Sequence, residues 1–112
     1  MHELGITRNI VAIVGEAANG RPVSRVTLEI GKLSGVMGEA IAFCFDVVAA
    51  GTALEGARLE ILEINGRARC EACAAEFDTQ TLFTPCPCGS RRLVRLRGEE
   101  MLIKSMQFKE AA

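Results

Sequence analysis

The spacing of hydrophobic residues predicts a first helix over residues 4–18. Apolar side chains recur there at helical intervals and form one stripe, made of Ile6, Ile10, Val11, Ile13, Val14, Ala17 and Ala18. Thr7 and Arg8 are mostly off that stripe, so we expect them on the solvent side. Asn19-Gly20 followed by Pro22 is a strong stop signal. The helix therefore begins almost at the amino terminus, with the first three residues at its mouth.

The pattern then changes to the alternation that is typical of strands. Residues 23–30 alternate cleanly, with Val26, Leu28 and Ile30 on one face. A largely apolar second helix follows over residues 38–50, and it either lies deep in the core or contributes to a homodimer contact. Later segments predict further strands over residues 58–64 and 101–108 and a short one over 91–97. The alternation slips within residues 58–64, which a bulge or an edge twist would explain.

Two close pairs of cysteines interrupt this pattern. The sequence reads Cys70-Glu-Ala-Cys73, then twelve residues, then Cys86-Pro-Cys88. Four thiolates in two pairs are typical of a closed, structural zinc site, so we predict that Cys70, Cys73, Cys86 and Cys88 bind Zn²⁺. Two disulfides are the alternative, but the cysteine count of five is odd and the chain starts without a secretory signal. The fifth cysteine, Cys44, is expected to be a buried small hydrophobe.

The order of these segments predicts an α+β fold. A small three-stranded sheet would carry two helices on one face, and a zinc-ribbon-like insert would precede the last strand. We accordingly divide the chain into an α+β domain, residues 1–68 and 98–112, and a zinc-binding domain, residues 69–97.

Composition narrows the possible functions. The chain has 112 residues, a net charge of −1 and neither Trp nor Tyr, which argues against general nucleic-acid binding. No apolar run approaches the roughly 18 residues of a membrane span, so we expect no membrane insertion and a cytoplasmic location. Two alternatives stay open. One is a zinc-ribbon interaction or nucleic-acid module that uses the arginines of residues 91–97, and a weaker one is a thiol redox enzyme that uses Cys70 and Cys73.

The first three residues form a second candidate metal site. His2 is the only histidine, and a terminal histidine is most often simply solvated. However, the Met1 amine, the His2 amide and the His2 imidazole can form two fused chelate rings. The amide or carboxylate of Glu3 can complete a square, which suits Ni²⁺ or Cu²⁺ rather than zinc. The amine and the imidazole titrate near about 8 and 6.5, so such a site would bind reversibly at neutral pH.

Taken together, these features resemble those of a known family. The Met1-His2-Glu3-Leu4 start, the Ile30-Gly31-Lys-Leu-Ser34-Gly35-Val36 segment, the Ala42-Phe43-Cys44-Phe45-Asp46 helix and the two cysteine pairs ending in Cys88-Gly89-Ser90 occur in this order. Nearly the whole chain resembles the hydrogenase nickel-incorporation proteins, the HypA/HybF family. The combination of the Met-His-Glu start with the late cysteine pairs is specific, whereas either feature alone would be weaker.

The resemblance implies a nickel metallochaperone that is not an enzyme. It would bind Ni²⁺ through Met1, His2 and Glu3, hold structural zinc on the four paired cysteines, and work with a hydrogenase-maturation GTPase. The nickel would go to the [NiFe]-hydrogenase large subunit, and some family members also serve urease maturation. Two departures stand out. The second cysteine pair is one residue shorter than the common family form, and Met37-Gly38 occupies the stretch where the family has an acidic residue near nickel.

Overall fold

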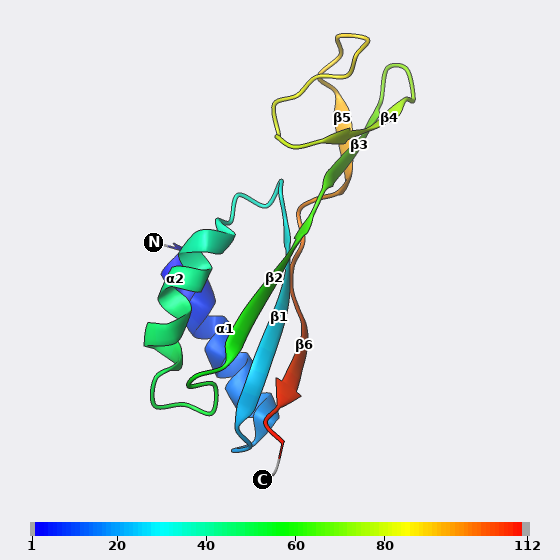
Figure 1. The fold of residues 1–112 in the computed structure, drawn as a ribbon. Helices are drawn as coiled ribbons and strands as arrows, with labels where there is room; N and C mark the ends of the chain where they lie inside the picture. Colours follow the sequence, from blue (N-terminus) through cyan, green and yellow to red (C-terminus); the bar gives the residue numbers. More distant parts are fainter. Residues whose placement is uncertain (1, 111–112) are drawn as a thin grey trace. The chain divides into compact units, whose positions relative to one another are not determined.

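A computed structural model describes residues 2–110 of the chain (Figure 1). Its elements, in chain order, are α1 (His2–Ala18), β1 (Val23–Gly31), α2 (Gly38–Ala49), β2 (Arg58–Ile64), β3 (Gly66–Cys70), β4 (Glu76–Thr79), β5 (Leu93–Arg97) and β6 (Met101–Phe108). They form two three-stranded sheets with strand orders β2-β1-β6 and β4-β3-β5. The predicted α+β class, with a three-stranded sheet, two helices and a cysteine-rich module, is confirmed.

The described residues divide into two compact units. The first comprises residues 2–28, Met37–Ile61 and 103–110, and the second comprises Glu29–Val36 and Leu62–Leu102. The second unit is thus larger than the zinc-binding segment predicted at residues 69–97, and it includes a piece of chain that precedes α2. The division into a nickel-binding α+β domain, residues 1–68 and 98–112, and a zinc-binding domain, residues 69–97, remains a prediction.

The first unit has a hydrophobic core between its helices and strands. Both helices lie on one side of β1 and β2 (Figure 1). The side chains that are almost fully buried there include Phe45, Leu28, Ile41, Leu54, Val23 and Val26. On the other face of the central strand, β1, Thr27 is buried and its hydroxyl lies 3.4 Å from the carboxylate of Glu60, whereas Arg25 and Glu29 are half-buried.

The first helix differs from the prediction in four places. It begins at His2, not at residue 4, so His2 and Glu3 belong to its first turn. Thr7 is fully buried, because its hydroxyl donates to the Glu3 carbonyl 2.7 Å away and its methyl group can then face the core. Ile13 and Ala17, both expected on the apolar stripe, are exposed, Ile13 to 56%. The predicted stop is confirmed by the positive φ angles of Asn19 (51°) and Gly20 (86°).

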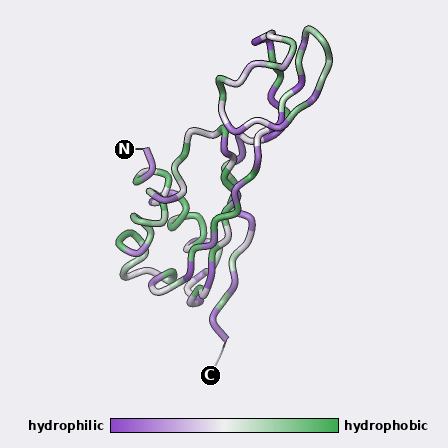
Figure 2. The backbone as a smooth tube through the Cα atoms, turned by 45° about the horizontal axis from the view of Figure 1, so that its top comes forward, coloured by the Kyte–Doolittle hydropathy of each residue, from purple (hydrophilic) through white to green (hydrophobic). Residues whose placement is uncertain are grey.

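The second helix has one buried and one exposed apolar face. Hydrophobic residues predominate along it (Figure 2), but only Ile41, Phe45 and Ala49 are buried. Phe43 and Val47 are exposed. Cys44 is half-buried, less than expected from the sequence. No helix within residues 2–110 is long and apolar enough to cross a membrane.

The second unit contains two strands that the sequence analysis did not predict, β3 and β4. β3 pairs antiparallel with β4, with Arg67 opposite Asp78, and with β5, with Cys70 opposite Leu93. Arg67 donates to the Asp78 carboxylate at 2.7 Å and lies 3.4 Å from that of Glu76, which links β3 to β4. β5 confirms the short strand expected within residues 91–97.

Three glycines allow close backbone contacts within the second unit. A Cβ atom on Gly31 would overlap the carbonyl oxygen of Gly98, one on Gly66 would overlap that of Thr79, and one on Gly98 would overlap the Cα atom of Gly66. The backbone N–H of Leu33 donates to the Gly98 carbonyl at 2.7 Å, and Leu33 is 4% exposed. Side chains at these glycines would therefore push apart strands that the unit needs in contact.

Candidate metal centres

The structure brings the four paired cysteines into one cluster. Their sulfur atoms all lie within 4.8 Å of one another, and all four are free of disulfide bonds. The contacts cross between the two pairs: Cys70 Sγ lies 3.7 Å from Cys88 Sγ, and Cys73 Sγ lies 3.5 Å from Cys86 Sγ. Cys70 and Cys86 are buried, whereas Cys73 and Cys88 are exposed.

These distances fit a tetrahedral zinc site. With Zn–S bonds of about 2.3 Å, the sulfurs of a regular tetrahedron lie about 3.8 Å apart. A disulfide would require the sulfurs to approach to about 2.05 Å. The arrangement therefore favours four thiolates around one ion over the two-disulfide alternative. No other group of three or more His, Cys, Asp or Glu side chains within residues 2–110 converges in this way.

The first cysteine pair lies in the turn that joins β3 to β4. The N–H of Ala74 donates to the Cys70 carbonyl at 2.9 Å, and the N–H of Ala72 donates to the Cys70 sulfur at 3.3 Å. Ala74 has a positive φ angle of 65°, a conformation that usually belongs to glycine. These hydrogen bonds aim the sulfurs of Cys70 and Cys73 at the same point.

The second pair lies in a tight turn, which explains how a Cys-x-Cys spacing can supply two ligands. The N–H of Gly89 donates to the Cys86 carbonyl at 2.7 Å and closes a four-residue turn. Pro87 occupies the second position of this turn, where its fixed φ is favourable, and Gly89 has a φ angle of 95°. The turn, rather than an extended segment, brings Cys88 beside Cys86.

The surroundings of the sulfurs shift their acidity in opposite directions. Backbone N–H groups, first that of Cys73 and then that of Ala72, lower the pKa of the Cys70 thiol to about 6 against the effect of burial. The N–H of Cys88 lowers the pKa of Cys86, but burial and the neighbouring sulfurs raise it overall to about 12. The Cys86 thiol thus resists ionisation beside the other sulfurs, and a divalent cation in the cluster would favour its thiolate.

The predicted nickel residues lie at the start of α1. His2 is exposed, with a side-chain accessibility of 68%, and its Nε2 lies 3.3 Å from the Glu3 carboxylate. Met1, the third predicted nickel residue, lies outside the described residues. His2 and Glu3 are in the first helical turn, where backbone N–H groups have no acceptor within the helix.

Glu3 has a partner that the sequence analysis missed. Its carboxylate accepts a hydrogen bond from the backbone N–H of Met37 at 3.3 Å, and only 18% of its side chain is exposed. This hydrogen bond is the main reason why the pKa of Glu3 is lowered. Met37 is the N-cap residue of α2, so one carboxylate connects the starts of both helices. A backbone amide carries no sequence signal, which is why this contact could not be predicted.

A family comparison decides the identity. Residues 1–108 match the family model described as hydrogenase/urease nickel incorporation, metallochaperone, hypA. The chain belongs to the HypA family. Its relatives include the hydrogenase maturation factor HypA of Trichormus variabilis, 57% identical, with 98% of this chain and 97% of the relative covered. Another is that of Geobacter sulfurreducens, 47% identical, with 96% and 98% covered.

Solved HypA structures have the same fold. The Ni metallochaperone HypA from Helicobacter pylori superposes with a TM-score of 0.64 at 20% identity, covering 95% of this chain and 96% of that one. A second HypA solution structure gives a TM-score of 0.69 at 23% identity, covering 97% of both chains. The family model and the curated relatives confirm the predicted family: this is a member of the HypA metallochaperones for hydrogenase maturation, with a Cys₄ cluster suited to zinc.

Proposed function

We propose that this chain binds Ni²⁺ at its amino terminus and delivers it to the [NiFe]-hydrogenase large subunit during maturation. The observation that carries the proposal is the exposed His2 imidazole beside Glu3 in the first turn of α1, in a chain of the HypA family. The ligands would be the Met1 amine, the His2 amide and imidazole, and Glu3. Ni²⁺ favours such square arrangements of nitrogen and oxygen donors.

The position of the site on a helix makes nickel binding both possible and reversible. The His2 and Glu3 amides can lose their protons to a metal without breaking a helical hydrogen bond, because first-turn N–H groups have no helical acceptor. The positive end of the helix dipole opposes a bound cation, which favours release. Glu3 is held by the Met37 N–H, so its amide is a more available ligand than its carboxylate.

Zinc would have a different role, to hold the second unit in its folded form. Cys70, Cys73, Cys86 and Cys88 would bind it permanently as thiolates. Thiolates suit zinc, whereas the nitrogen donors at the amino terminus suit nickel, so the two metals would be sorted by ligand type. No bond in a substrate is made or broken in this scheme, so we expect no enzymatic activity.

The partners follow from the proposed function. We propose a cytoplasmic protein that works with a hydrogenase-maturation GTPase and hands its nickel to the hydrogenase large subunit. We also propose that the chain can serve urease maturation and can form a homodimer. Neither nucleic acid nor membrane is required.

Calorimetric titration of Ni²⁺ into the zinc-loaded, tag-free chain tests the nickel site. Wild type should bind one Ni²⁺. His2→Ala should weaken binding by more than about tenfold, because the loss of a residue that merely supports a metal ligand already costs about that much affinity. One glycine added before Met1 should also weaken binding because it moves the amine out of the chelate, whereas one glycine added after Ala112 should not. Equal nickel affinity in wild type and His2→Ala would refute the terminal site.

A further inference from the structure

A small hollow in the second unit has a lining that fits neither zinc nor nickel. Its volume is about 70 Å³, and its lining includes Leu33, Leu82 and Leu93 on the apolar side and Arg91, Arg95 and Thr79 on the polar side. At about 30 Å³ for each water molecule in the liquid, this space suits a ligand group the size of two or three waters. It contains no cysteine or histidine and is therefore separate from the metal centres.

The two arginines of this hollow have weak partners within residues 2–110. Arg91 Nη1 donates to the carbonyl oxygen of Phe83 at 3.2 Å, a neutral group, and Arg91 forms no ion pair there. Arg95 Nη1 pairs with the Glu99 carboxylate at 3.3 Å, but both side chains are about half exposed, at 45% and 54%. A solvent-exposed pair of this kind contributes little. Two guanidinium groups are thus available to a stronger acceptor.

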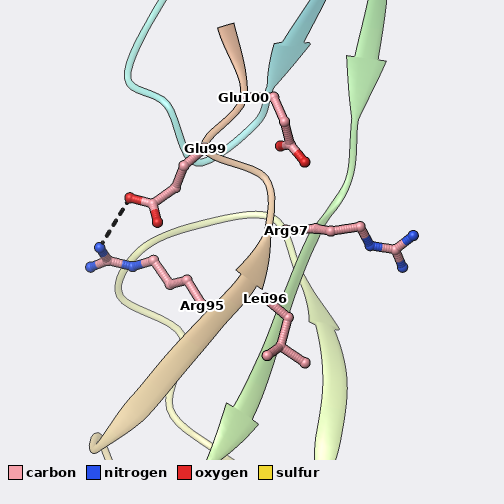
Figure 3. Close-up of a pocket in the computed structure, with 5 residues that line it drawn as sticks. All are labelled: Arg95, Leu96, Arg97, Glu99 and Glu100. Atoms are coloured by element: carbon pink, nitrogen blue, oxygen red, sulfur yellow. Dashed lines mark hydrogen bonds and ion pairs between the residues drawn. The ribbon is translucent and has the colours of Figure 1, made fainter.

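A second hollow of the same unit shares Arg95 with the first and is drawn in the close-up (Figure 3). Arg95 and Glu99 meet on one side of β5, whereas Arg97 points to the other side (Figure 3). This neighbouring hollow, lined by Arg95, Leu96, Arg97, Glu99 and Glu100, is wide and carries charges of both signs. It therefore offers no excess of positive charge, unlike the hollow that contains Arg91.

The Thr79 hydroxyl forms its hydrogen bonds within the loop, so the two arginines are the groups that can bind a ligand in the hollow. Thr79 Oγ1 donates to the Thr81 carbonyl at 2.8 Å, and the N–H of Thr81 lies 3.4 Å from the same oxygen. Thr81 Oγ1 in turn contacts Thr84 Oγ1 at 2.9 Å. These contacts hold the chain between β4 and the second cysteine pair, so the position of Leu82 beside Arg91 is built into the loop.

We propose that this hollow binds a carboxylate on a short apolar stem, the side chain of a glutamate or aspartate that a partner protein inserts. A guanidinium group presents two parallel N–H donors that match the two oxygens of a carboxylate. The leucines provide contacts for the methylene groups of the stem. Charge complementarity selects an acidic partner, and the volume selects a single carboxylate.

Glu99 acts as an internal competitor in this scheme. Its carboxylate already accepts a hydrogen bond from Arg95, so an incoming carboxylate must displace it. Removal of the Glu99 charge should therefore tighten binding, an effect that a merely structural role for these residues would not produce.

The test uses the zinc-loaded, nickel-free full chain and a blocked tripeptide, acetyl-Gly-Glu-Gly-amide, with the glutamine version as its matched control. Binding is followed by NMR at constant ionic strength through the arginine Nε–Hε signals and the backbone amide of Thr79. The glutamate peptide should shift these signals and the glutamine peptide should not. Arg91→Gln and Arg95→Gln should each weaken binding by about tenfold, the worth of a hydrogen bond to a charged group.

Matched variants separate a specific pocket from general charge. Arg92→Gln removes the same charge from an exposed neighbour and should leave the affinity unchanged. Glu71→Gln is the control for Glu99→Gln, because it removes a negative charge that does not contact Arg95. Glu99→Gln should therefore strengthen binding more than Glu71→Gln does. Equal losses for Arg91→Gln and Arg92→Gln would overturn the proposal, as would equal binding of both peptides. Tighter binding of inorganic phosphate than of the glutamate peptide would overturn the assignment of a carboxylate. Because no nickel is present, these outcomes are independent of the proposed delivery function.

Discussion

Ala74 stands in a backbone conformation that side chains with a Cβ atom rarely adopt. Its φ angle is 65°, and its N–H donates to the Cys70 carbonyl in the turn that holds the first cysteine pair. A left-handed conformation costs an L-residue about 1 kcal/mol. The strained residue directly follows Cys73, in the turn that supplies two of the four clustered sulfurs.

Replacement of this residue by glycine should release the strain. Ala74→Gly is expected to raise the free energy of unfolding by about 0.5–1 kcal/mol, because glycine adopts positive φ freely. The measurement is denaturant unfolding at a fixed, buffered zinc concentration. Ala75→Gly is the matched control: Ala75 lacks a positive φ angle, so glycine there should be neutral or destabilising. A lower stability of Ala74→Gly would contradict this account.

At the residue scale, roles that depend on a side chain's own chemistry could be predicted from the sequence. The two cysteine pairs indicated a cluster of four sulfurs because thiolate spacing is a local property. The buried Thr7 and the Glu3 contact could not be predicted, because each depends on a backbone group that the sequence does not reveal. Thr7 uses the Glu3 carbonyl, and Glu3 uses the Met37 N–H.

At the scale of elements, α2 illustrates how an apolar sequence can have two different faces. Phe45 is 2% exposed and lies in the core of the first unit, whereas Phe43, two residues earlier, is 86% exposed. Both are phenylalanines in the same helix, so helix propensity and composition cannot distinguish them. Packing against α1 decides which face is buried.

The two phenylalanines should therefore respond very differently to truncation. Phe45→Ala is expected to lower the free energy of unfolding by about 3–5 kcal/mol, because it leaves a cavity in the core. Phe43→Ala is expected to change it by no more than about 0.5 kcal/mol, as for a surface position. Thermal unfolding followed by circular dichroism at equal protein concentration checks both values. Similar losses for the two variants would show that Phe43 is covered in solution.

The strands missed in the sequence have a common explanation. β3 alternates Arg67 and Arg69 with the buried Ala68 and Cys70, but alanine and cysteine are small, so this alternation gives only a weak strand signal. β4 has four residues, too few for a clear period. The long strands β1 and β6 were predicted because each contains several large apolar residues, such as Leu28 in β1 and Ile103 and Phe108 in β6.

At the scale of the whole molecule, the two units draw their stability from different sources. The first unit buries large apolar side chains, including Phe45, Leu28 and Ile41. The second unit buries fewer and smaller apolar residues, which are Ile30, Leu33, Ala68, Cys70 and Cys86, and Phe83 and Leu82 are exposed. So small an apolar core indicates that metal binding supplies much of the folding free energy, as in other small structural zinc modules.

Removal of zinc should therefore unfold the second unit and leave the first unit folded. With a strong chelator, the amides of β3, β4 and β5 are expected to lose protection against hydrogen exchange, whereas those in the middle of α1 and α2 should keep most of theirs. Hydrogen exchange followed by mass spectrometry measures both sets in one sample. Restored protection after zinc is added back is the control, and equal loss of protection in both units would contradict separate stabilisation.

Leu33 has a practical consequence for anyone who wishes to study the two metals apart. This residue precedes α2 in the chain, yet it is buried within the same unit as the cysteines. Excision of residues 69–97 would leave it uncovered, and an isolated peptide of those residues would lack it altogether. Cutting the chain at these positions would thus disturb both units. Single amino-acid replacements are therefore the better way to abolish binding of one metal while retaining binding of the other.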